Sequence, residues 1–132
     1  MLVRFEIDGP VARLTLDSPH NHNALSTALV TELRDGLDAA AASGARAVVL
    51  GHTGRTFCAG ADLTALGAAT EDGLRVIYDG FLAVADCALP TIAAVNGPAV
   101  GAGLNLALAA DVRIAGPAAV FDPRFQKLGI QI

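Results

Sequence analysis

The apolar and polar positions of the first sixteen residues alternate in the way that predicts a β-hairpin. Residues 2–7 and 11–16 are the alternating segments, and the Asp-Gly-Pro sequence between them supplies a short turn. After a polar loop, the apolar spacing changes to that of a helix from Ser26 to about Ala42. Ser26 is the predicted N-cap and Gly44 ends the helix. Its expected buried stripe consists of Leu29, Val30, Leu33, Leu37, Ala40 and Ala41.

Strand-like and helix-like segments alternate through the rest of the chain. The predicted strands cover residues 46–50, 91–95, 112–115 and 120–121. The predicted helices cover residues 62–66, 71–88 and 101–110. The helix at 71–88 is amphipathic, and its apolar side consists of Leu74, Ile77, Tyr78, Phe81, Leu82 and Ala85. This alternation is typical of a layered α/β fold, and no linker or low-complexity tract divides residues 1–132, so one domain is predicted.

Composition narrows the classes of function. A formal net charge of -4 and 5% aromatic residues argue against nucleic acid as a partner. Cys58 and Cys87 are too few for a disulfide framework, which favours reduced thiols and a cytoplasmic protein without a secretory signal. Residues 87–110 carry no charge and are long enough for a membrane helix, but glycine, proline and asparagine interrupt them. A buried strand, turn and helix are predicted there, and no membrane association is expected.

Two glycine-rich turns carry the candidate chemistry. Residues 57–63 (Phe-Cys-Ala-Gly-Ala-Asp-Leu) form the first and residues 96–104 (Asn-Gly-Pro-Ala-Val-Gly-Ala-Gly-Leu) form the second. Each follows an apolar strand and leads into a helix, so backbone N–H groups at the helix start point away from the chain without a partner. Two such turns that face each other form an oxyanion hole. The alternative is that the glycines only let helices pack closely on strands.

Other site motifs do not fit. Gly101 and Gly103 match a dinucleotide fingerprint, but Leu106 occupies its third glycine position. No lysine follows a glycine loop as in a phosphate-binding loop, and no serine lies in a nucleophile elbow. The pair His20 and His22 lacks a third ligand at metal spacing, so a solvated loop is predicted and no metal site. His52 is interpreted as a loop residue after a strand.

Five short motifs carry a family resemblance. They are Asn23-Ala24-Leu25, residues 54–63, residues 90–97, Gly101-Ala102-Gly103 with Leu106-Ala107, and Asp111. In order and spacing, over nearly the whole chain, they resemble the crotonase (enoyl-CoA hydratase/isomerase) family. The resemblance implies the ClpP/crotonase fold of repeated ββα units and an acyl-CoA thioester substrate.

The same resemblance assigns roles to single residues. It implies that the backbone N–H groups of Ala61 and Ala102 are the oxyanion donors. Contacts with coenzyme A, which enters as part of the substrate and not as a bound cofactor, are implied for the residues Ala24, Ala59, Asp62 and Leu63. For the Asp62 side chain the alternative is a helix-stabilising acid in a first turn.

The chain departs from the family at its acids. Hydratases of the family use two glutamates to hold and activate water, and Asn105 and Phe125 occupy the two positions here. An amide orients water but cannot take its proton near neutral pH, and a phenyl ring does neither. Hydration by the usual pair is therefore not supported. Asp122 is an acid in the right neighbourhood, which serves either as a base or as a cap for the turn before Pro123.

Length is a second departure. Family members are longer, and the C-terminal helical part that closes their acyl pocket and builds their oligomers is missing here. We therefore expect a crotonase core domain truncated at its C-terminus, with a homotrimer or hexamer for the full-length form. Three hypotheses follow: an enzyme acting on acyl-CoA through an oxyanion, a catalytically silent acyl-CoA-binding homologue, or a non-functional fragment.

Overall fold

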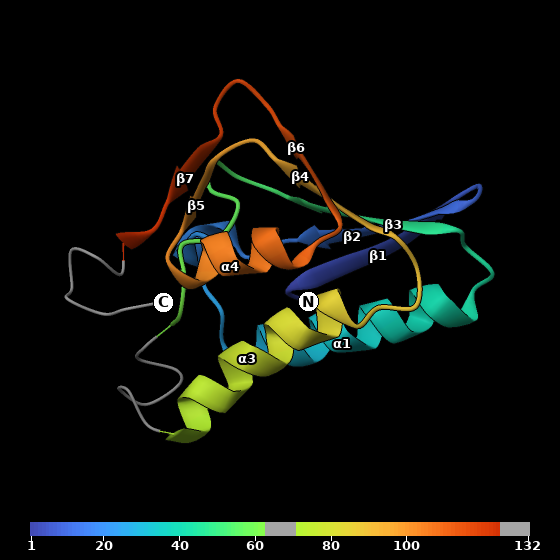
Figure 1. The fold of residues 1–132 in the computed structure, drawn as a ribbon, viewed down its shortest axis with the longest axis horizontal. Coiled ribbons are helices and arrows are strands. Elements are labelled where there is room, and N and C mark those ends of the chain that lie inside the picture. Colours follow the sequence, from blue (N-terminus) through green and yellow to red (C-terminus); the bar gives the residue numbers. More distant parts are fainter. Residues whose placement is uncertain (63–70, 125–132) are drawn as a thin grey trace.

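The computed structural model describes residues 1–62 and 71–124 and has a five-stranded main sheet (Figure 1). The strand order is β1-β2-β3-β4-β6, with β1 antiparallel to β2 and the other pairs parallel. Its strands are β1 (Val3–Asp8), β2 (Val11–Leu16), β3 (Ala47–His52), β4 (Thr91–Val95) and β6 (Val112–Ala115). A second sheet pairs β5 (Pro98–Val100) with β7 (Val120–Asp122) in parallel. The element order contains the ββα units that the resemblance implied.

Three helices pack on one side of the main sheet (Figure 1). They are α1 (Thr27–Ala42), α3 (Glu71–Ala85) and α4 (Ala102–Ala109), and a short 3-10 helix, η1 (Pro19–Asn21), lies in the polar loop. Alternate residues of the central strands point into the core beneath these helices. These inward residues are Leu14, Leu16, Val48, Leu50, Ala93 and Val95. On the opposite face no described helix lies over the sheet, and Val112 and Ile114 of β6 are 51% and 59% exposed.

The segment from β1 to the end of α1 contains the predicted hairpin and helix. β1 and β2 form the hairpin, and the Ser26 hydroxyl caps α1 by accepting the Leu29 N–H at 3.1 Å. Gly44 follows the helix with a φ of +82°. The buried stripe of α1 includes five of the six expected residues, together with Gly36. The exception is Ala41, which is exposed because it lies beyond the edge of the face that contacts the sheet.

Only part of the predicted apolar side of α3 is buried, since Ile77 and Phe81 are half-buried and pack against the core. Leu74, Tyr78 and Leu82 are 50%, 61% and 53% exposed. The buried residues of α3 are Gly73, Gly80 and Val84. A Cβ placed on Gly80 would be in ordinary contact with a methyl group of Val30, at 3.4 Å, so Gly80 faces α1. Hydrophobic periodicity gives no weight to glycine, so it does not detect a helix face on which glycines are buried.

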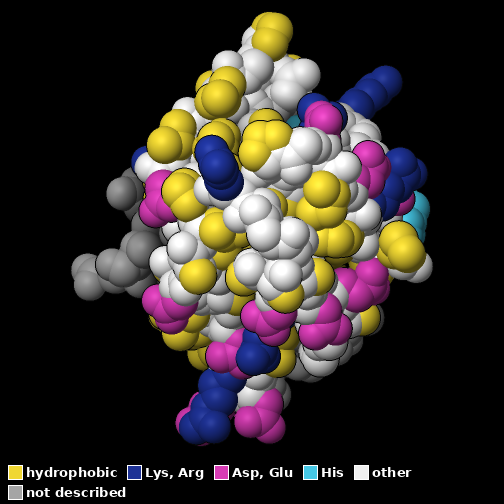
Figure 2. All heavy atoms as spheres, turned by 90° about the vertical axis from the view of Figure 1, so that its right-hand side faces the viewer, with side chains coloured by type: hydrophobic (Ala, Val, Ile, Leu, Met, Phe, Trp, Pro, Cys, Tyr) yellow, Lys and Arg dark blue, Asp and Glu magenta, His cyan; other side chains and the backbone are white. Residues whose placement is uncertain are grey.

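The uncharged stretch 87–110 contains β4, β5 and the whole of α4, as the predicted strand, turn and helix. Within the described ranges, no helix is both long and apolar enough to cross a membrane. The short helix predicted at 62–66 falls largely outside the described residues. The glycine turns lie where the parallel strands end, on the left of Figure 1. The opposite end, which holds the β1–β2 turn, shows hydrophobic side chains above and acidic ones below (Figure 2).

Candidate active site

The two glycine turns pack backbone against backbone. Cys58 and Ala99 form a parallel bridge, and the Val100 N–H donates to the Cys58 carbonyl at 3.0 Å. A Cβ placed on Gly60 would lie 3.1 Å from the Val100 carbonyl oxygen and 3.8 Å from the Ala102 nitrogen. A Cβ placed on Gly103 would overlap the Cys58 carbonyl group. Glycine is therefore required at 103 for the two turns to meet.

The first turn presents the N–H of Ala61 away from its own strand partner. The Leu25 N–H donates to the Gly60 carbonyl at 2.7 Å, and the Asp62 N–H donates to the Leu25 carbonyl at 2.8 Å. In a parallel bridge of this kind, the residue between these two bonds points its N–H to the other side. Gly60 has a φ of +109°, a conformation that favours glycine. Among the described residues, the Ala61 N–H has no acceptor.

The second turn presents the N–H of Ala102 at the start of α4. Gly101, with a φ of +55°, is the residue before the helix and has no side chain to cap it. Its own N–H donates to the Asp122 carbonyl of β7 at 2.9 Å. Within the part of the chain that the structure describes, the Ala102 N–H has no acceptor. A helix start with free donors is a site for negative charge.

The coenzyme A residues of the sequence prediction lie along two paired segments, 22–25 and 59–62. The Ala59 N–H donates to the His22 carbonyl at 3.0 Å, and the Leu25–Ala61 bridge continues the pairing. Ala59 is exposed, whereas Ala24 and Asp62 are half-buried. The structure thus brings Ala24 next to Ala59 and Asp62, which belong to the first turn. Leu63 lies outside the described residues.

Of the positions tied to acid chemistry, two are described. Asn105 is half-buried, three residues after Ala102 on the same helix, and its amide has no hydrogen-bond partner among the described residues. Asp122 pairs in register with Val100, which places it beside the second turn. Its carboxylate contacts the Arg124 guanidinium at 3.1 Å and, in the described ranges, caps no backbone N–H. Phe125 lies outside the described residues.

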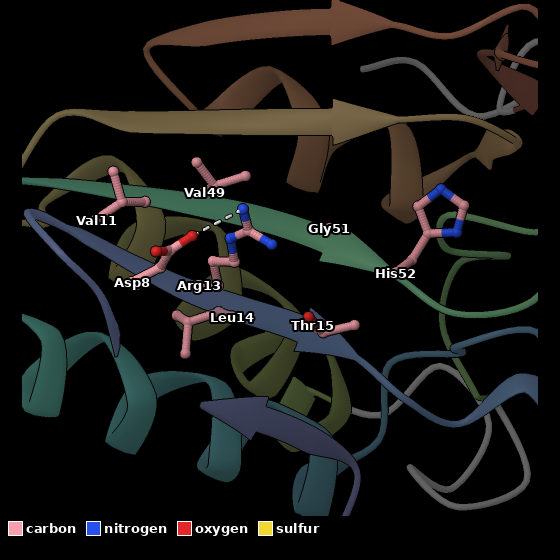
Figure 3. Close-up of a pocket in the computed structure, with 8 residues that line it drawn as sticks. All are labelled: Asp8, Val11, Arg13, Leu14, Thr15, Val49, Gly51 and His52. Atoms are coloured by element: carbon pink, nitrogen blue, oxygen red, sulfur yellow. Dashed lines mark ion pairs between the residues drawn. The ribbon is translucent and has the colours of Figure 1, made fainter. Parts of the chain in front are cut away.

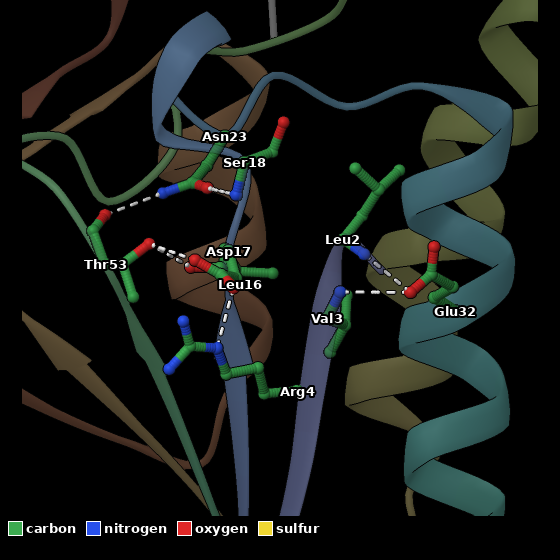
Figure 4. Close-up of polar contacts among 9 residues, drawn as sticks. All are labelled: Leu2, Val3, Arg4, Leu16, Asp17, Ser18, Asn23, Glu32 and Thr53. Carbon is green, nitrogen blue, oxygen red and sulfur yellow. Dashed lines mark hydrogen bonds and ion pairs between the residues drawn. The ribbon is translucent and has the colours of Figure 1, made fainter.

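Asn23 supports the first turn through its side chain, a role that sequence reasoning missed (Figure 4). It is fully buried and has a φ of +56°. Its Oδ1 accepts the Ser18 N–H at 2.7 Å, and its Nδ2 donates to the carbonyls of Thr53 at 3.2 Å and Thr56 at 2.9 Å. The signal was available, since asparagine both tolerates a left-handed backbone and bonds in both directions.

A polar cluster continues from this support on the same side of the loop (Figure 4). The Thr53 hydroxyl donates to Asp17 at 2.8 Å, and Arg4 donates to the other oxygen of that carboxylate at 2.7 Å. These two hydrogen bonds, the Thr53 bond first, lower the pKa of Asp17. The cluster fixes the start of the loop that leads from β3 to the first turn.

His52 was predicted to be a loop residue, and this is wrong. It is the last residue of β3, and its ring reaches the chain after β4. It borders a hollow of about 380 Å³ on the uncovered face of the sheet, between β2 and β3 (Figure 3). The hollow is lined by Asp8, Val11, Arg13, Leu14, Thr15, Val49, Gly51 and His52, and by neither glycine turn.

The structure also bears on nucleophilic chemistry at Cys58 and on metal binding. Burial raises the pKa of the Cys58 thiol to about 12, so this cysteine is a packed core residue and not a nucleophile. His22 Nδ1 lies 3.2 Å from the Thr56 hydroxyl. No group of three or more His, Cys, Asp or Glu side chains that could hold a metal ion is found across the described residues.

Comparison with known proteins gives a single family. The family model described as Enoyl-CoA hydratase/isomerase matches residues 6–131. The chain is 55% identical over 133 residues to "Probable enoyl-CoA hydratase EchA14" of Mycobacterium tuberculosis, covering 97% of this chain and 52% of that protein.

Solved structures agree with this family. An enoyl-CoA hydratase of Mycobacterium smegmatis superposes with a TM-score of 0.88 at 33% identity, over 98% of this chain and 53% of that one. One of Mycobacterium avium superposes with a TM-score of 0.85 at 43% identity, over 97% of this chain and 52% of that one. The chain thus spans about half the length of the relatives it matches. The predicted crotonase-like α/β fold is confirmed, and the chain belongs to the enoyl-CoA hydratase/isomerase family.

Proposed function

We propose that the protein acts on acyl-CoA thioesters and stabilises the anion that forms at the thioester oxygen with the N–H groups of Ala61 and Ala102. The observation that carries this proposal is that the two turns contact each other and that neither N–H group has an acceptor among the described residues. Fixed backbone donors of this kind stabilise an oxyanion by about 2.7–4 kcal/mol each. The names of the relatives, which are enoyl-CoA hydratases, support the same substrate class.

The other site residues take supporting roles in this proposal. Ala59 and Asp62 of the first turn, and Ala24 in the segment paired with it, would contact the coenzyme A part of the substrate. Asn105 would orient a water or a substrate oxygen through its free amide. Asp122 is the candidate proton acceptor, since its carboxylate lies beside the second turn, where it contacts the Arg124 guanidinium. Asp122→Asn should then abolish proton removal while leaving thioester binding intact.

The oxyanion hole can be tested by removing a single N–H. Ala102 is the first helical residue of α4, where proline fits the backbone and lacks only the donor. Ala102→Pro should therefore keep the fold and lose the donor, whereas Ala102→Gly keeps the donor and serves as the matched control. The probe is a 3-oxoacyl-CoA, whose enolate carries the charge that the site is proposed to hold and absorbs in the near ultraviolet.

We expect the enolate fraction of the probe to be higher when it is bound to the wild-type protein or to Ala102→Gly than when it is free in solution. In Ala102→Pro the enolate-to-keto ratio of the bound probe should be about 10²–10³-fold lower than in the wild type. Thermal melts with and without the probe give binding separately, because a ligand that binds only the folded form raises its stability. An unchanged enolate band in Ala102→Pro, in a protein that still binds the probe, would overturn the oxyanion assignment.

Binding without turnover is the second candidate function. It is favoured by Asn105, since an amide stands where hydratases of the family carry a glutamate. In this case the wild-type chain would bind acyl-CoA without hydrating an enoyl-CoA, and the double variant Asn105→Glu, Phe125→Glu would gain hydration. For the whole protein we propose a homotrimer or hexamer, which sedimentation velocity would measure.

A further inference from the structure

The His52 ring lies between the segments that carry the two glycine turns. Its Nε2 accepts the backbone N–H of Asn96, the first residue of the second turn, at 3.0 Å. The Phe57 ring, at the start of the first turn, contacts it edge-on, with 5.5 Å between centroids and an angle of 86°. His52 itself ends β3. One side chain therefore touches the strand end, the first turn and the second turn.

The hydrogen bond from Asn96 fixes the protonation of the ring. A nitrogen that accepts an N–H carries no hydrogen, so the neutral ring bears its hydrogen on Nδ1. Nδ1 is buried and has no hydrogen-bond partner among the described residues. A doubly protonated ring has no acceptor left, so protonation of His52 must break the bond to Asn96.

Asn96 links the His52 ring to the rest of the second turn through hydrogen bonds and strand pairing. Its Oδ1 accepts the Ala118 N–H at 3.1 Å, two residues before β7 begins. β7 pairs with β5, and its last residue, Asp122, accepts the Gly101 N–H at 2.9 Å. The residue after Gly101 is Ala102, the proposed donor. A displacement of Asn96 therefore reaches that donor through β5 and β7.

The surroundings of the ring favour its neutral form. Burial lowers the pKa of His52 below its ordinary value of 6.5, and the backbone groups of Thr53, Gly54 and Thr56 act against that effect. The charged groups on neighbouring elements are Asp8 and Arg13, which share the hollow, and Asp17, which follows β2. Asp8 and Asp17 are paired with Arg13 and Arg4, and none of the four contributes to the shift.

We propose that His52 is a positioning residue, which holds the second oxyanion turn in place through Asn96 while its ring is neutral and releases it when the ring is protonated. This inference rests on the proposed function only for its effect on the thioester. The structural coupling from His52 to Ala102 stands without any ligand and can be tested alone.

The first experiment is ¹⁵N NMR of the ligand-free chain as a function of pH. The expected result is an Nδ1–H tautomer for His52 and a titration below 6.5 that the amide resonances of both Asn96 and Ala102 follow. His52→Gln, whose amide oxygen accepts the Asn96 N–H without titrating, should remove that pH dependence. His20→Gln, at an exposed histidine of η1, is the matched control and should leave it unchanged.

The proposal would be overturned by an Nε2–H tautomer of His52. It would also be overturned by an Ala102 amide resonance that does not shift as His52 titrates. Both outcomes are read from the wild-type chain, so the test does not depend on the folding of a variant. A second measurement uses the enolate band of bound 3-oxoacyl-CoA. His52→Phe, which keeps an aromatic ring and loses the acceptor, should lower the enolate fraction about two- to tenfold at neutral pH, the worth of one hydrogen bond, and His52→Gln should restore it.

The two arms separate the two proposals. NMR coupling without any enolate in the wild-type chain would contradict the proposed function and leave the positioning role of His52 intact. An enolate that forms equally in His52→Phe and in the wild type would contradict the positioning role and leave the oxyanion hole intact.

Discussion

The two glycine turns present the same kind of group, a backbone N–H, but they are held in different ways. The first turn depends on a buried side chain, because Asn23 ties the loop from Thr53 to Thr56 to the segment that pairs with Ala61. The second turn is held largely by main chain, through the β5–β7 pairing and the bond from Gly101 to Asp122. A turn supported by one side chain is sensitive to substitution at that residue, whereas a main-chain ladder tolerates many side chains.

The largest effect is expected where the two turns touch. Gly103→Ala should lower the free energy of unfolding by more than about 3 kcal/mol, because the new methyl group would overlap the backbone carbonyl of Cys58 and the main chain must separate. Gly51→Ala is the matched control, since a Cβ there has open space and Gly51 has no positive φ. Urea denaturation of the three proteins gives the comparison. Equal stability of Gly103→Ala and wild type would mean that the turns do not meet as described.

Asn23→Ala should be the next largest change and should act on the first turn. It removes three hydrogen bonds and leaves the Ser18 N–H and two carbonyls unpaired at a buried site, and alanine is strained at a φ of +56°. The expected loss is about 3 kcal/mol. Asn105→Ala, which removes an amide without a partner among the described residues, should stay within about 0.5 kcal/mol of wild type.

The effect of Asn23→Ala on the first turn can be measured separately, through the reactivity of Cys58. Cys58 belongs to the first turn and bridges Ala99 of the second. Its thiol is buried and its pKa is raised to about 12, so it should resist alkylation in the folded protein. In a Cys87→Ser background, alkylation of Cys58 reports how often the first turn opens. Asn23→Ala should speed this reaction, and Asn105→Ala should not. A Cys58 that reacts equally in both would show that Asn23 does not hold the first turn.

Ser26→Ala should have a smaller effect at the helix next to the first turn. The Ser26 hydroxyl accepts the Leu29 N–H, and the loss of such an N-cap costs about 1 kcal/mol. Ser26→Thr keeps the acceptor and should recover most of the stability. Thermal melts of both variants measure the difference. If Ser26→Thr loses as much as Ser26→Ala, then packing at this position and not the cap determines the stability.

The sequence predicted the elements and the two turns because their signals are local. The hairpin alternates, α1 has a cap and a glycine stop, and each turn has its glycines at the required positions. The sequence did not predict features that depend on contacts between residues far apart in the chain. His52 reaches a residue 44 positions away, β5 needs β7 as its partner, and α3 faces α1 with Gly80. The pattern of the turns predicted free N–H groups at the helix starts, whereas the assignment of the donors to Ala61 and Ala102 came from the family resemblance.

The smallest predicted effect tests whether the second turn is held largely by its main chain. Arg124→Ala removes the ion pair between Arg124 and Asp122. The Arg124 side chain is 57% exposed, and ion pairs at exposed positions contribute little to the free energy of unfolding. The expected change is below about 0.5 kcal/mol, because the contribution of Asp122 to the second turn is its carbonyl, which every residue supplies. Urea denaturation measures this change, with Arg75→Ala at the exposed Glu71 pair as the control. A loss above about 1.5 kcal/mol in Arg124→Ala alone would show that the Asp122 side chain holds the second turn as well as its carbonyl does, and the two turns would then differ in degree and not in kind.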